Sequence, residues 1–110
     1  MLNKDTYCLE TIIEAIDRIN EYTSGFSTAD EFNNDYRNFD ATMMNFVVIG
    51  EMVEKLSEDF KRKYNSIEWI KIKGFRNIVA HDYFGIDAEE VWQLVKNKIP
   101  DLKNKIQQLI

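Results

Sequence analysis

A short segment near position 80 holds residue types that could cut a phosphodiester. Arg76 could bind a phosphate and stabilise its charge. His81 is the only histidine in the chain, and histidine is the residue type best suited to moving protons near neutral pH. Asn77 could orient the imidazole or contact the same phosphate. On a helix Asn77 and His81 would share one face, because residues four apart are neighbours.

Helix geometry also predicts how the other residues of this segment lie. Arg76 and Tyr83 are seven residues apart and would differ by only about 20° around a helix axis. Arg76 and His81 would lie about 140° apart, so they flank a common edge and could both reach one bound phosphate. We therefore expect Arg76, Asn77, His81 and Tyr83 to lie close together near the end of one helix.

Ordinary structural roles remain open for each of these residues. His81 could be a helix-end imidazole that complements the helix dipole. Arg76 could pair with Glu51 or Glu54, and Tyr83 could pack in the core. A metal centre is disfavoured, because one histidine with scattered carboxylates matches no familiar ligand spacing. The sequence thus predicts neither a metal nor a cofactor.

The composition sets limits on what this segment can belong to. The chain has 110 residues, of which 45% are hydrophobic and 30% charged, as expected for one domain with one core spanning 1–110. One cysteine, Cys8, excludes an intrachain disulfide, and we expect it to be a small core residue. No apolar run approaches the ~18–20 residues that span a bilayer, and the N-terminus lacks a signal core. We expect a soluble, cytoplasmic protein without a membrane partner.

Charge is unevenly distributed along the chain. The net charge is −5, which disfavours nucleic-acid binding through bulk charge. Residues 61–76 nevertheless carry six basic side chains and one acidic one, Glu68. Such a stripe could steer a polyanion to one face, or it could be a solvated helix surface.

Apolar residues repeat at intervals of three and four throughout, which predicts helices. Stripes over 9–19, 46–60, 67–79 and 91–109 indicate four main helices, and a short helix follows Ser27, which would cap it together with Asp30. Short connections favour antiparallel neighbours. The fold class is therefore all-α, an up-and-down bundle of four main helices plus a short one.

Helix boundaries are marked by particular residues. Gly25 follows the first stripe, and Ser66 is placed to cap the fourth main helix. Asp87 and Glu90 form a candidate capping box for the last helix, with Ile86 and Val91 as a hydrophobic staple. Pro100 removes a backbone donor, so we expect a kink there.

The run from Arg76 to Tyr83, RNIVAHDY, resembles the signature of the HEPN superfamily, an arginine and a polar residue followed by a histidine. The tyrosine two residues after the histidine is similar to HepT-like toxins of MNT–HEPN toxin–antitoxin pairs. Ile49-Gly50-Glu51 resembles the family's Gly-Glu step in its third helix. Trp69, Trp92 and the Ile99-Pro100-Asp101-Leu102 run also fall in the family's order, so the resemblance covers roughly residues 5–105.

The resemblance implies an all-α homodimer whose two motifs meet and act as a metal-independent endoribonuclease, with Arg76 and His81 as catalytic residues. It also implies a cognate minimal nucleotidyltransferase antitoxin, which silences the toxin by AMPylation of Tyr83, as in type VII systems. The alternative is a non-catalytic helical subunit that binds a nucleotidyltransferase or presents its substrate. The intact Arg76–His81 pair favours the enzyme.

Overall fold

The computed structural model of the chain describes residues 3–82 and 87–110. Within α6 the side chains of residues 78 and 80–82 are not described. Tyr83 and Ile86 lie outside the described residues, and with them the predicted position of Tyr83 and the predicted staple. Throughout the described ranges the regular structure is helical, with no strand, which confirms the all-α class.

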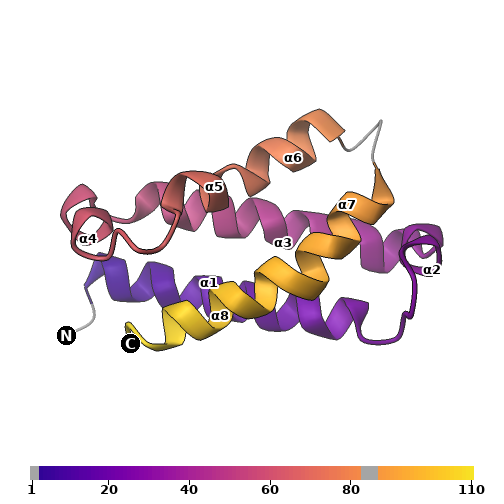
Figure 1. The fold of residues 1–110 in the computed structure, drawn as a ribbon, viewed down its shortest axis with the longest axis horizontal. Coiled ribbons are helices and arrows are strands. Elements are labelled where there is room, and N and C mark those ends of the chain that lie inside the picture. The colour runs from indigo at the N-terminus through magenta and orange to yellow at the C-terminus, as the bar shows by residue number, and fades with distance from the viewer. Residues whose placement is uncertain (1–2, 83–86) are drawn as a thin grey trace.

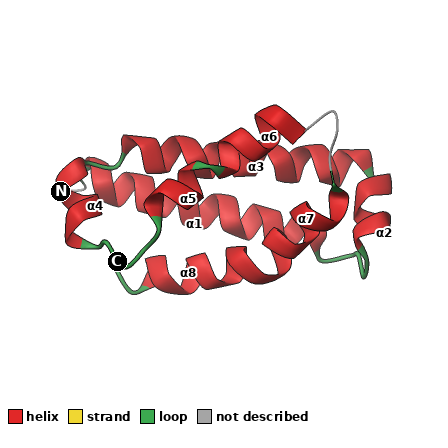
Figure 2. Cartoon of the chain, turned by 45° about the horizontal axis from the view of Figure 1, so that its top comes forward, coloured by secondary structure: helices red, strands yellow, loops and turns green. Residues whose placement is uncertain are grey.

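The helices run back and forth along a body of 42 × 25 × 21 Å (Figure 1). The bounds of the elements are α1 (Lys4–Thr23), α2 (Ala29–Asn34), α3 (Tyr36–Lys55), α4 (Glu58–Lys63), α5 (Trp69–Lys73), α6 (Phe75–Asp82), α7 (Ala88–Gln93), a π-helical turn (Leu94–Lys98) and α8 (Ile99–Gln107). α1 packs along α3. In both views α5 and α6 lie over α3, whereas α8 runs beside α1 (Figures 1 and 2).

The two longest helices bury the stripes that the sequence predicted. Leu9, Ile12, Ile16 and Ile19 of α1 are at most 2% exposed, and the apolar stripe of α3 faces them. Phe32 of α2 is fully buried, with its ring 5.2 Å from that of Phe39 and 5.6 Å from that of Trp92 (centroid distances), which closes one end of the bundle. Cys8, which was predicted to be a small core residue, is buried, and so is Trp69.

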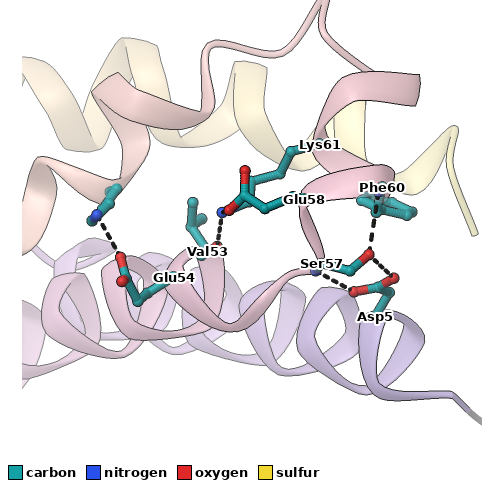
Figure 3. Close-up of polar contacts among 8 residues, drawn as sticks. Asp5, Val53, Glu54, Ser57, Glu58, Phe60 and Lys61 are labelled. Carbon is teal, nitrogen blue, oxygen red and sulfur yellow. Dashed lines mark hydrogen bonds and ion pairs between the residues drawn. The ribbon is translucent and has the colours of Figure 1, made fainter.

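The third helix is shorter than its apolar stripe predicted. α3 ends at Lys55, and Leu56 is extended, with φ −60° and ψ 141°, although it stays buried. Ser57 then caps α4 by accepting the Phe60 N–H. The carboxylate of Asp5 accepts both the Ser57 N–H (2.8 Å) and the Ser57 hydroxyl (2.7 Å), which fixes this turn against α1 (Figure 3). The prediction of a continuous helix to Phe60 was therefore wrong.

Three other boundaries differ from the prediction. Thr28, with Glu31, forms the capping box of α2 in place of Ser27 and Asp30. Ser66 does not cap a helix: α5 begins after Glu68 without a side-chain cap, and the Trp69 indole N–H donates to the Tyr64 carbonyl across the preceding turn. Gly74 divides the predicted fourth helix into α5 and α6.

The last helix follows its prediction more closely. Asp87 caps α7 by accepting the N–H groups of Glu89 and Glu90. The irregularity expected at Pro100 is a π-helical turn just before it, and Pro100 itself stands in the first turn of α8. Proline has no N–H to donate to the preceding turn, so the wider hydrogen bonding of the π-helical turn falls where that donor is missing.

Candidate active site

Three of the predicted site residues, Arg76, Asn77 and His81, lie on α6, which is helical from Phe75 to Asp82. This continuous helix confirms the backbone spacing that the predicted arrangement of Arg76, Asn77 and His81 requires. Phe75 and Val79 pack against the core, so Arg76 lies at the flank of the helix and Asn77 is exposed. The side chains of His81 and Tyr83 are not among those that the structure describes. That they lie close to Arg76 therefore remains a prediction.

The base of α6 lies unusually close to α3. The ring of Phe75 packs edge-on against Phe46, with centroids 5.5 Å apart and an interplanar angle of 85°. A Cβ built on Gly50 would lie 2.9 Å from the Arg76 Cβ and 3.1 Å from the Lys73 carbonyl oxygen. Only a residue without a side chain fits between these helices, so Gly50 sets how closely Arg76 approaches α3.

Glu51, the next residue of α3, binds Arg76. Its Oε1 accepts a hydrogen bond from Arg76 Nη1 at 2.7 Å. This hydrogen bond, together with the charges of Glu51 and Glu54, raises the pKa of Arg76 further above its already high ordinary value. Arginine is a cation at any ordinary pH, and the contact with Glu51 holds this one in place while 35% of its side chain stays exposed. Of the alternatives left open by the sequence, pairing with Glu51 is the one that the structure contains.

A second ion pair lies one turn farther along α3, at its contact with the end of α5. Glu54 Oε2 is 2.6 Å from Lys73 Nζ, and the hydrogen bond and charge of Lys73 lower the pKa of the Glu54 carboxyl (Figure 3). The two pairs are antiparallel: the later acid, Glu54, binds the earlier base, Lys73, and the earlier acid, Glu51, binds Arg76. Glu51 and Glu54 are three residues apart, as are Lys73 and Arg76, and this matched spacing is the signal in the sequence that could have found both pairs.

The basic side chains of residues 61–76 are each engaged within the chain. Lys61 pairs with Glu58, Arg62 with Asp59, and Lys71 with Glu68. The ammonium of Lys63 lies 5.3 Å from the centre of the Tyr64 ring. With the pairs that Lys73 and Arg76 form with α3, five of the six basic side chains are paired with an acidic one. The segment is therefore a solvated, charge-paired surface and not a bare basic stripe.

Metal ligands do not gather in the part of the chain that the structure describes: no three His, Cys, Asp or Glu side chains there are close enough to hold an ion. The same residues include no helix that is both long and apolar enough to cross a membrane.

Known proteins are similar to this sequence over most of its length. The profile of the family described as "Ribonuclease HepT-like" matches residues 12–109. The chain belongs to this family. A HepT-like protein of Thermococcus cleftensis, named "Probable ribonuclease HepT", is 37% identical over 101 residues, which cover 92% of this chain and 91% of that one. No solved structure matches the sequence.

Two further relatives come from Methanocaldococcus jannaschii. One, named "Putative RNase", is 36% identical over 102 residues, or 93% of this chain and 84% of that one. The other, named "Gamma-glutamylcyclotransferase and putative RNase", is 37% identical over 98 residues, which cover 89% of this HepT-like chain but only 44% of the relative. The HepT-like chain therefore spans less than half of that longer protein.

Proposed function

We propose that this HepT-like chain is a metal-independent endoribonuclease in which Arg76 and His81 are the catalytic residues. The observation that carries the proposal is the state of Arg76. Its guanidinium is held at the α3–α6 contact by the hydrogen bond to Glu51 and is still 35% exposed, on the helix that also carries His81. Membership of the ribonuclease HepT-like family supports RNA as the substrate.

The chemistry uses the 2′-hydroxyl of RNA as the nucleophile, which restricts cleavage to RNA. His81 would take the 2′-hydroxyl proton or protonate the departing 5′-oxygen, and a positioned acid or base contributes about 10²–10⁴ in rate. Arg76 would bind the scissile phosphate and stabilise its developing charge. Asn77, exposed one turn before His81 on α6, would orient the imidazole or contact the phosphate.

Each chain supplies one histidine, while the reaction needs both an acid and a base. We therefore propose a homodimer in which two copies of the Arg76–His81 edge face one cleft. Sedimentation or light scattering tests this assembly. A strictly monomeric protein that cleaves RNA would contradict it.

The ribonuclease activity would be controlled through Tyr83. A cognate minimal nucleotidyltransferase would transfer AMP from ATP to the tyrosine hydroxyl, with release of pyrophosphate, and so silence a toxic ribonuclease. The added phosphate would place a bulky anion near Arg76 and compete with RNA for its guanidinium. Intact mass after incubation with the partner and ATP should show whole AMP units on the wild type and none at this position in Tyr83→Phe.

The Tyr83→Phe chain should remain an active ribonuclease that escapes neutralisation, because only the acceptor oxygen is lost. A Tyr83→Phe chain that is still AMPylated and silenced would move the control to another residue.

A further inference from the structure

The Gly50–Glu51 step of α3 has no task in the chemistry above, yet it makes the contact with the base of α6. Gly50 is buried and faces the Cβ of Arg76, and Glu51 accepts the Arg76 Nη1 hydrogen bond at 2.7 Å. Both partners are partly open to solvent, with 42% of the Glu51 side chain and 35% of the Arg76 side chain exposed. The pair therefore lies where a bound phosphate could reach it.

A guanidinium offers five N–H donors in a fixed plane, so it can bind a carboxylate along one side and a phosphate along another. Among the described residues, the hydrogen bond to Glu51 uses Nη1 of the guanidinium. Arginine is otherwise a long, flexible side chain, and a carboxylate anchored on a neighbouring helix removes that freedom before substrate binds. Phosphate binding then requires no departure of the guanidinium from Glu51.

We propose that Glu51 is a positioning residue: it holds the Arg76 guanidinium so that its remaining donors meet the scissile phosphate. Gly50 is the position that lets α6 come close enough for this pair to form. The inference rests on the proposed role of Arg76 as the phosphate-binding catalytic residue, and it assigns a task to the Gly-Glu step.

Kinetics of matched variants test the proposal, since Glu54 offers a control one turn away on α3, where it pairs with Lys73 at the end of α5. Glu51→Ala should lower kcat about 10- to 100-fold, as expected when a reacting group is misplaced by up to ~1 Å, with little change in KM. Glu51→Gln keeps an oxygen acceptor at the same position and should recover most of the lost kcat. Glu54→Ala and Glu54→Gln, which release Lys73 instead, should cleave like the wild type.

Two results would overturn this role. If Glu51 merely competes with phosphate for Arg76, Glu51→Ala will bind RNA more tightly, with a lower KM and an undiminished kcat. If the pairs only hold the helices together, Glu54→Ala will lose as much activity as Glu51→Ala, in proportion to a lower thermal midpoint. Thermal unfolding of all four variants separates loss of fold from loss of positioning.

The side chain of Arg76 gives a readout that needs no RNA. In NMR spectra of the intact protein, the guanidinium N–H signals of Arg76 should exchange with water faster in Glu51→Ala than in the wild type or Glu54→Ala. Unchanged exchange would overturn the restraint by Glu51. A wild type that cuts no RNA would overturn the proposed function and this role together, whereas cleavage by the wild type and Glu51→Ala at equal rates would overturn the role of Glu51 alone.

Discussion

Gly50→Ala is the smallest change that separates α6 from α3. The added Cβ would lie 2.9 Å from the Arg76 Cβ, where carbon atoms normally rest at about 3.5–4.0 Å. The helices must therefore move apart by about 0.6 Å or more at this point, since the opposing atoms are a Cβ and a backbone oxygen that no rotamer can remove.

Two energies oppose each other in this variant. Overpacking destabilises the fold by about 1–3 kcal/mol, whereas alanine is about 1 kcal/mol more favourable than glycine within a helix. The free energy of unfolding should therefore fall by about 0–2 kcal/mol. The effect on RNA cleavage should be larger than the stability change suggests. A 1 Å misplacement can cost about 10²-fold, so a shift of about 0.6 Å predicts a rate loss of about tenfold.

Gly25→Ala is the matched control, because no atom lies within 4 Å of a Cβ built there and its φ is not positive. It should change stability by no more than about 0.5 kcal/mol and leave cleavage intact. Urea unfolding and initial cleavage rates of both variants provide the comparison. A Gly50→Ala protein with wild-type stability and wild-type cleavage would refute the close approach of α6 and α3 as a requirement of the site.

Three further predictions concern the scaffold. Asp5→Ala removes the acceptor of two Ser57 hydrogen bonds and should lower the free energy of unfolding by about 1.5–3 kcal/mol in urea titrations, whereas an unchanged midpoint would show that the α1–α4 connection is not stabilising. Thr28→Ala removes the cap of α2 and should cost about 1 kcal/mol in the same assay; a cost near zero would contradict the capping box. Cys8 is 1% exposed, and burial raises the pKa of its thiol. The free energy of unfolding should therefore fall above about pH 8.5, where the unfolded thiol ionises before the native one. A Cys8→Ala chain should lack this part of the dependence of stability on pH.

Hydrophobic periodicity predicted the long helices well because it reports burial directly. The stripes of α1 and α3 are the residues that face each other in the core. The same signal failed at Leu56, which is buried in an extended conformation and so continues the period across a break. At this break Ser57 is hydrogen-bonded to Asp5, 52 residues away, and the local sequence does not reveal that contact.

The candidate site, too, could be predicted only in part from the sequence. Helical spacing from Arg76 to His81 followed from the local sequence, and α6 has it. The partner of Arg76 did not follow, because Glu51 and Glu54 lie on one face of α3 and either could reach a guanidinium. The antiparallel register of α3 and α6 decides between them, and register is a property of the packed bundle.

Cleavage of a single-stranded RNA by the purified chain in excess EDTA tests the central claim most directly, with the wild type compared with His81→Ala and Arg76→Ala. The account predicts that the wild type cuts RNA and leaves 2′,3′-cyclic phosphate ends, that it spares DNA of the same sequence, and that both variants are folded by circular dichroism and inactive. Loss of cleavage in EDTA, cleavage of the DNA, or full activity of His81→Ala would contradict it.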